Sequence, residues 1–163
     1  MLQDKKLQME KLNQYNDVVS IFYKETDRAS AVLSASFLEN LLEDYLRKFM
    51  ITEKMVDNLF NGQGAFATFS SRISTCYALK YIPQNVYRDL DLIRKIRNYF
   101  AHNMNDASFD DEEIKNRINS FDFIRAAKFD IDKNSNKEKF LMTVGYITLF
   151  IMNQAIWTED TTL

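Results

Sequence analysis

Apolar residues recur every three to four positions along most of the chain, which is the spacing of one face of a helix. Thr26 or Asp27 can cap the second predicted helix, and Pro83 suits the opening turn of the fifth. The predicted helices cover about residues 3–24, 27–50, 52–60, 70–80, 83–101, 110–120 and 137–157. We therefore expect an all-α fold, an antiparallel helical bundle of about six to seven helices joined by short loops.

The composition agrees with this fold class. The 163 residues include three glycines and one proline, which is little material for the turns of an all-β protein. Hydrophobic residues make up 46% and charged residues 27%, a globular composition. The chain contains no repeat and no low-complexity linker. We expect a single helical domain over residues 1–163, with 137–157 as its C-terminal helix.

The stretch Phe140–Trp157 carries no charge and has two interpretations. Its length approaches that of a membrane span. It also contains Thr143, Asn153 and Gln154, and basic clusters do not flank both of its ends, so a central helix of a bundle or dimer is the better interpretation. The N-terminus is charged and lacks an apolar leader, so we expect a cytoplasmic protein with no membrane attachment.

Metal and disulfide chemistry find little support in the sequence. Cys76 is the one cysteine, so an internal disulfide is excluded, and its apolar neighbours predict a buried thiol. One histidine and scattered carboxylates give no metal-ligand spacing, and we expect no metal and no cofactor. The acidic stretch at residues 106–113 lacks the glycine of a calcium loop and is typical of a helix start.

Two predicted helices carry charged residues on their apolar faces. On the second helix, Arg28 and Glu39 fall on the apolar stripe, and on the fifth helix Arg97 does the same. A lone buried carboxylate is costly, so Glu39 should meet an arginine inside the bundle: Arg97, Arg72 or Arg94. Arginine suits such a position because its planar group matches a carboxylate and keeps its proton. These residues predict a supporting polar network.

A second polar line follows the same fifth helix. Arg94, Asn98 and His102 are each four residues apart and lie side by side if the helix continues that far. His102 is the only histidine of the chain. On a continuous helix it lies roughly 140° around the axis from Arg97. The two side chains can converge only if the helix ends early or if a second subunit supplies one of them.

Three segments together resemble the mannitol operon repressor (MtlR) family of bacteria. They are "DRASAVLSASFLENLLEDYLRKF" at 27–49, "LFNGQGAFATFSSRISTCYALKYI" at 59–82 and "YRDLDLIRKIRNYFAH" at 87–102. The resemblance covers about residues 27–121. It implies an all-helical protein that regulates transcription, either through DNA or through a partner protein, since the family has no recognisable DNA-reading motif.

A shorter resemblance concerns the segment Arg97–His102, which is similar to the arginine, polar residue and later histidine of HEPN domains. That resemblance implies a helical dimer and a metal-independent ribonuclease. In this interpretation Arg97 would bind the phosphate, His102 would move a proton and Asn98 would orient the site. The alternative is that Arg97 is occupied by Glu39 and that His102 only ends the helix as a C-terminal cation.

The sequence thus leaves more than one function open. The basic fifth helix is a poor reader of DNA by itself, because one of its arginines faces the core and its acids repel phosphate. Leu92 and Tyr99 lie opposite its core side and predict a surface for a second copy or another protein. Our first expectation is a dimeric transcriptional or stress regulator that acts through a protein partner. The alternatives are a ribonuclease that acts on RNA and a pure dimerisation scaffold.

Overall fold

The computed structural model describes residues 17–103, 107–126, 131 and 133–159, with side chains described up to residue 153. All described elements are helices. Residues 17–24 are helical, and the helices that follow are α2 (Asp27–Arg47), α3 (Lys54–Phe60), α4 (Phe69–Ala78), α5 (Gln84–His102), α6 (Glu112–Asn119), α7 (Asp122–Ala126) and α8 (Asn136–Glu159). The predicted all-α fold is confirmed. The part of the first predicted helix before residue 17 lies outside the described residues.

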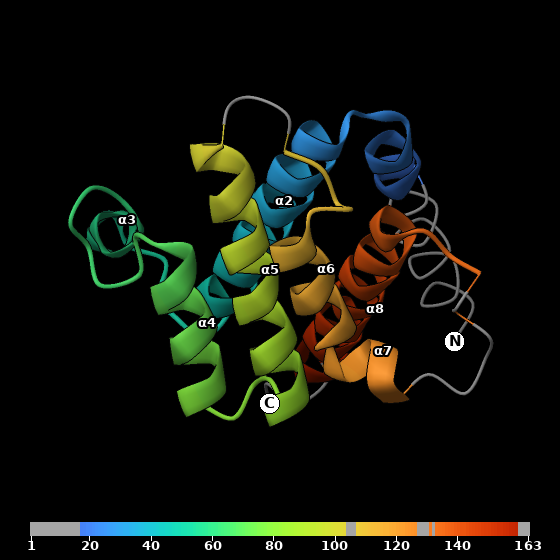
Figure 1. Cartoon of the computed structure of the whole chain (residues 1–163). Coiled ribbons are helices and arrows are strands. Elements are labelled where there is room, and N and C mark those ends of the chain that lie inside the picture. The colour runs from blue at the N-terminus through green and yellow to red at the C-terminus, as the bar shows by residue number, and fades with distance from the viewer. Residues whose placement is uncertain (1–16, 104–106, 127–130, 132, 160–163) are drawn as a thin grey trace.

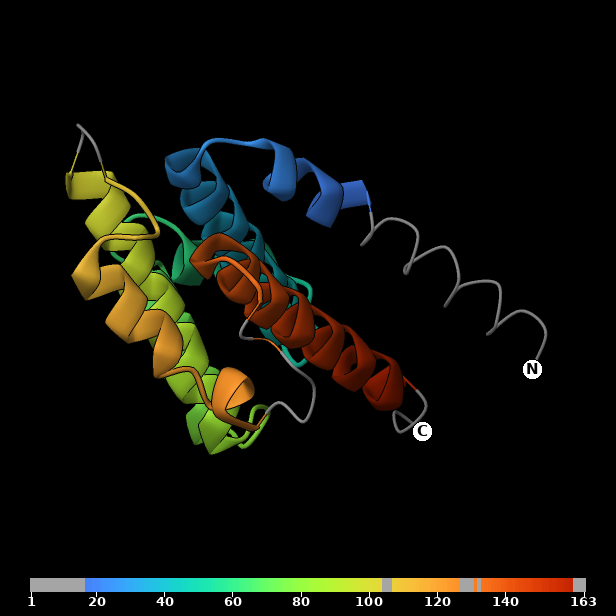
Figure 2. The same cartoon turned by 45° about the vertical axis from the view of Figure 1, so that its right-hand side comes forward.

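Helix α5 is the element around which the others are arranged (Figures 1 and 2). It packs against α2, α4, α6, α7 and α8, and α2 also packs against α4 and α8. Helix α3 lies at the edge of the bundle in Figure 1, away from α8. As a result, the outer face of α5 is bordered by α4 on one side and by α6 and α7 on the other, as Figure 1 shows.

The core follows the predicted helical periodicity. On α5 the buried apolar residues are Val86, Leu90, Ile93, Ile96 and Phe100, all fully enclosed. They recur every three to four positions and so form one stripe. Cys76 of α4 is buried as well, and burial raises the pKa of its thiol to about 12, which keeps the sulfur protonated and unreactive.

Helix α8 contains the long uncharged stretch, and it is a packed core helix. Phe140, Val144, Ile147 and Ile151 are buried on the side that meets the bundle. The hydroxyl of Thr148 donates to the carbonyl of Val144 within the same helix, which satisfies a buried polar group. In the part of the chain that the structure describes, none of the helices is sufficiently long and apolar to cross a membrane.

Two local features were not predicted from the sequence, namely helix α7 and the backbone conformation at the glycines that follow α3. Helix α7 lies in the segment after residue 120, where no helix was predicted. In the connection after α3, Gly62 has a φ of +58°, and a Cβ on Gly64 would stand 2.2 Å from the carbonyl oxygen of Asn58. Gly64 therefore allows a close backbone approach that another residue would block.

Candidate functional site

The guanidinium of Arg72, on α4, is the centre of a buried charge network. Its side chain is only 7% exposed, and its Nη2 lies 2.7 Å from the carboxylate of Glu43 on α2. Glu39 on the same helix is 4.0 Å from its Nη1. Backbone carbonyls take up the remaining donors, among them that of Phe66 at 2.8 Å from Nε. Arg72 thereby ties α2, α4 and the loop between α3 and α4 into one unit.

The network continues from Glu43 toward α3. Arg47, one turn further along α2, places Nε 2.9 Å from Glu43 and Nη1 2.9 Å from Asp57 of α3. Its guanidinium also lies over the ring of Phe60, 4.2 Å from the ring centroid. These contacts combine an ion pair with a cation–π interaction, and they attach the short helix α3 to the bundle.

On its other side the network reaches α5 through Glu39. Arg97 places its Nη2 3.7 Å from the Glu39 carboxylate, which is the pairing expected from the apolar stripes. The Nε of Arg97 is buried and has no hydrogen-bond partner among the described atoms. Arg97 is thus held next to a carboxylate by a loose contact and is not fully hydrogen-bonded.

The structure brings together some of the residues predicted for this network and separates others. Glu39, Arg72 and Arg97 lie together as described above. Arg94 instead turns to Asp91 on its own helix, at 2.7 Å. Arg28 lines an apolar hollow of about 420 Å³ between the N-terminal end of α2 and Ala101 of α5.

The candidate ribonuclease residues do not converge within one chain. Helix α5 continues without a break to His102, so Arg97 and His102 keep the separation of roughly 140° around one axis that a continuous helix imposes. Arg97 turns toward Glu39, whereas His102 is exposed and Asn98 is half-buried. An RNA phosphate bound at Arg97 would therefore need a proton-transfer group from elsewhere.

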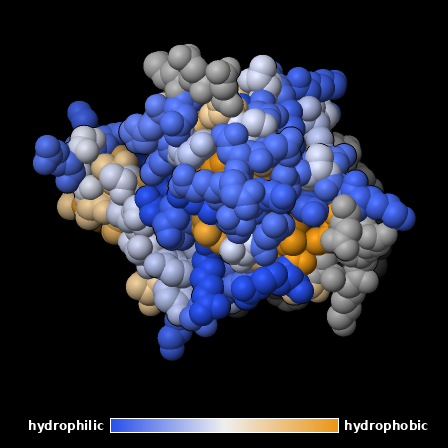
Figure 3. Space-filling model, viewed as in Figure 1, coloured by the Kyte–Doolittle hydropathy of each residue, from blue (hydrophilic) through white to orange (hydrophobic). Residues whose placement is uncertain are grey.

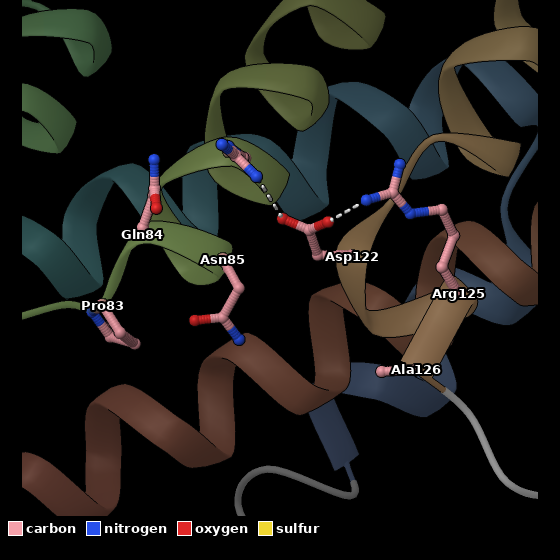
Figure 4. A pocket seen from close by; sticks show the side chains of 7 residues that line it. Pro83, Gln84, Asn85, Asp122, Arg125 and Ala126 are labelled. Atoms are coloured by element: carbon pink, nitrogen blue, oxygen red, sulfur yellow. Dashed lines mark hydrogen bonds and ion pairs between the residues drawn. The ribbon is translucent and has the colours of Figure 1, made fainter.

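A groove runs along the outer face of α5 and is closed on the other side by α7 (Figure 4). Its first part, about 640 Å³, begins at the start of α5. Its second part, about 340 Å³, reaches Lys95. Arg88, Asp122 and Arg125 line both parts. The carboxylate of Asp122 lies 3.7 Å from Arg88 Nη1 and 2.7 Å from Arg125 Nη2, as the dashed lines in Figure 4 mark.

The wall of this groove depends on a buried acid, Asp89. Its two carboxylate oxygens accept hydrogen bonds from the backbone N–H groups of Asp122, at 2.7 Å, and Phe123, at 3.0 Å. They satisfy donors at the beginning of α7 that a helix cannot satisfy internally. Burial raises the pKa of Asp89, and the two backbone hydrogen bonds offset only part of that rise. Asp89 therefore fixes α7 against α5.

Several of these residues were not found from the sequence. Glu43 and Arg47 lie away from the centre of the apolar stripe of α2, where charged residues normally face solvent. The spacing of Glu39, Glu43 and Arg47, four residues apart in turn, was the available signal. Asp89 also gave a signal, because it lies three positions after Val86 and four before Ile93, at the edge of the apolar stripe of the predicted helix. In the described part of the chain, no cluster of three histidine, cysteine or acidic residues could hold a metal ion.

Comparisons with known proteins cover most of the chain. A model of the mannitol repressor (MtlR) family matches residues 5–156. The chain is also similar to a chain of the X-ray structure of the MtlR–HPr complex from Escherichia coli, with a TM-score of 0.69 and 17% identity, over 84% of this chain and 97% of that one. No curated protein matches. The family match extends well beyond residues 27–121, to which the sequence resemblance was limited, and includes most of α8.

Proposed function

The chain belongs to the mannitol repressor family, and we propose that it regulates transcription by binding a protein partner. The observation that carries this proposal is the family match over residues 5–156. The structural neighbour supports the second half of the proposal, because that protein was solved as a complex with HPr. An HPr from the organism that encodes this chain is accordingly the first partner to test.

The charges of α5 favour a protein contact over direct reading of DNA. Arg94 and Lys95 both pair with Asp91, at 2.7 and 2.9 Å. Arg88 faces Asp122 and Arg97 faces Glu39. A helix that reads the major groove needs cations free for phosphates and side chains free for base edges. On α5 each of these cations is already paired with an acid, and these acids would also repel the DNA backbone.

The ribonuclease alternative stays a prediction with a demanding requirement. Because Arg97 and His102 diverge on one continuous helix, a second copy would have to place its own histidine beside Arg97. Two-fold association is itself a prediction from the sequence. The exposed apolar side chains of Leu33, Ile51 and Met55 are available for such a contact.

The experiment combines a genetic and a binding measurement. Transcript levels are compared in the wild-type strain, in a strain that lacks the gene and in the complemented strain. In parallel, the purified chain is titrated with HPr by calorimetry. We expect a restricted set of transcripts to change and to return on complementation, together with saturable binding of HPr. Unchanged transcripts would contradict the regulatory role, and an absence of HPr binding would contradict this choice of partner.

A further inference from the structure

Four large apolar side chains are exposed around the beginning of α3. They are Phe49, Ile51, Met55 and Leu79, with exposed fractions of 44%, 63%, 59% and 51%. Phe49 and Ile51 belong to the connection from α2 to α3, and Met55 lies in the first turn of α3. Leu79 directly follows α4. Figure 3 shows apolar surface over α3, beside hydrophilic residues. These four residues are named the α3 patch.

Aromatic contacts join the segments that carry the α3 patch. Phe49 stacks on Tyr81, with the ring centroids 4.3 Å apart. Both rings also make edge contacts with the buried ring of Tyr45, at 5.4 Å between centroids. Because Tyr81 lies two positions after Leu79, the stack holds the end of α4 against the connection from α2 to α3. The patch is therefore a preformed surface, which a binding partner need not order first.

The exposed area of the α3 patch is sufficient for a weak protein–protein contact. A free side chain of this size presents on the order of 200 Å², so the four exposed fractions correspond to roughly 400 Å² of apolar surface. The largest apolar patch of an ordinary monomer measures about 300–600 Å² and often has a function. A standard interface buries about 800 Å² per partner. The patch thus supplies about half of such an interface, which predicts association in the micromolar range.

The charges beside the patch indicate what covers it. Glu53 and Lys54 are adjacent at the beginning of α3, and both are exposed. In the part of the chain that the structure describes, neither side chain forms an ion pair, unlike the cations of α5. The two charges cancel, so this edge selects neither an acidic nor a basic partner. A two-fold axis close to the beginning of α3 places Lys54 of each copy opposite Glu53 of the other.

We propose that the α3 patch binds the same patch of a second copy, so that the chain forms a two-fold dimer. Ile51 and Met55, the two most exposed members of the patch, lie at the centre of the contact. Lys54 of each copy pairs with Glu53 of the other. The exposed side chain of Lys80 stays in solvent at the rim. The dimer goes beyond the proposed function and does not depend on it, because a protein partner can bind elsewhere on the surface.

Two other surfaces suit a second copy less well. Leu92 and Tyr99, which were predicted from the sequence for this contact, are half-buried and pack against the core. The hydroxyl of Tyr99 also donates to the carboxylate of Asp111, at 3.0 Å. Leu33 is 44% exposed, but it stands beside the apolar hollow near the beginning of α2. That position is roughly 20 Å from Phe49 along the helix, so Leu33 offers a matched control.

The test measures self-association of the full chain by sedimentation velocity at protein concentrations across the micromolar range. The variants are Met55→Glu in the patch, Leu33→Glu as the control, and the charge reversals Glu53→Lys and Lys54→Glu. The two charge-reversal variants are measured separately and as an equal mixture. Each variant is also titrated with HPr, and a melting curve verifies that it is folded.

We expect wild type to show a monomer–dimer equilibrium, and Met55→Glu to weaken the dimer about tenfold or more, because it buries a charge at the centre of the contact. Leu33→Glu should stay within about twofold of wild type. Glu53→Lys and Lys54→Glu alone should each weaken the dimer, since like charges then face each other across the axis. Their mixture should associate more tightly than either variant alone, because opposite charges meet again.

The outcomes separate the dimer from the proposed function. If wild type stays monomeric and Met55→Glu no longer binds HPr, the patch belongs to the protein partner, and the dimer proposal is overturned while the proposed function stands. A wild type that is monomeric in any case overturns the dimer, and so does a dimer that is lost in folded Leu33→Glu but kept in Met55→Glu. If Met55→Glu is not folded, the mixture decides: a mixture that associates no better than its two components overturns the proposal.

Discussion

Replacing Arg72 by methionine should destabilise the protein strongly, because this cation is the centre of the buried network. Its side chain is 7% exposed and pairs with Glu43 at 2.7 Å. It also donates to the backbone carbonyl of Phe66, at 2.8 Å. Methionine keeps much of the aliphatic length of the side chain but removes every donor, together with the guanidinium that lies 5.7 Å from the ring centroid of Phe60. The change thus isolates the polar contribution of Arg72 from its packing.

The magnitude follows from what the substitution leaves behind. Removing one partner of a buried ion pair costs about 3–5 kcal/mol. The lower end applies here, because Glu43 is 23% exposed and keeps Arg47 at 2.9 Å. We expect a loss of about 3 kcal/mol from an unfolding free energy on the order of 5–15 kcal/mol. For a domain of this size that corresponds to a melting temperature lower by roughly 6–12 °C.

The assay is urea denaturation followed by circular dichroism, with Arg125→Met as the matched control. Arg125 makes an equally short contact, 2.7 Å to Asp122, but it is 62% exposed. Solvent screening limits such a pair to less than about 1 kcal/mol. Glu43→Gln and the double variant complete a cycle, in which we expect a coupling of about 1–3 kcal/mol. If Arg72→Met costs no more than Arg125→Met, or if the two network substitutions are additive, the network does not hold the helices as argued.

Three further changes test other parts of the structure. Asp89→Asn replaces one of two acceptor oxygens at the start of α7 by a donor and should cost about 1–3 kcal/mol in urea denaturation. Burial raises the pKa of Asp89, so the native state holds the proton of this carboxyl more tightly than the unfolded state does. The contribution of Asp89 to the free energy of unfolding therefore falls as pH rises from the ordinary pKa of an aspartate through the native pKa of Asp89. The Asn variant should lack that slope, and an unchanged pH profile would contradict the assignment. Gly64→Ala should lower the melting temperature, since its Cβ would meet backbone atoms of α3 at 2.2–2.5 Å, while Gly62→Ala offers a comparison at a position with open space but positive φ. His102→Ala should leave stability nearly unchanged and should not alter any RNA degradation measured with EDTA present; loss of a metal-independent cleavage in a folded His102→Ala would revive the ribonuclease interpretation.

The helices were predictable because their apolar periodicity is local. The predicted fifth helix, 83–101, corresponds to α5 at Gln84–His102, and the predicted second helix extends three residues too far, to Met50 instead of Arg47. Helix α7 was not predictable in this way. It has five residues, and its first N–H groups are satisfied by Asp89, which lies more than thirty positions earlier. Its stability comes from a tertiary contact that a local pattern does not contain.

The site was predictable where a charge interrupted an apolar stripe. Glu39 and Arg97 stood out for this reason, and they lie 3.7 Å apart. Glu43 is the nearer partner of Arg72 and was missed, because its position on α2 reads as half-exposed. Arg94 was predicted to join the network, but it pairs instead with Asp91, three residues earlier on its own helix. The groove could not be found at all, since one of its walls is α7.

The unequal attachment of α3 and α5 has a consequence for hydrogen exchange. The interior amides of α5 are covered by α2, α4, α6, α7 and α8 at once, so a deuteron can reach them only when most of the bundle opens. Helix α3 is held at the edge by the Arg47 contacts to Asp57 and Phe60 and by Arg72. Its amides should exchange by a local opening that leaves the rest of the molecule folded. The two helices should thus report two separate free energies within one small protein.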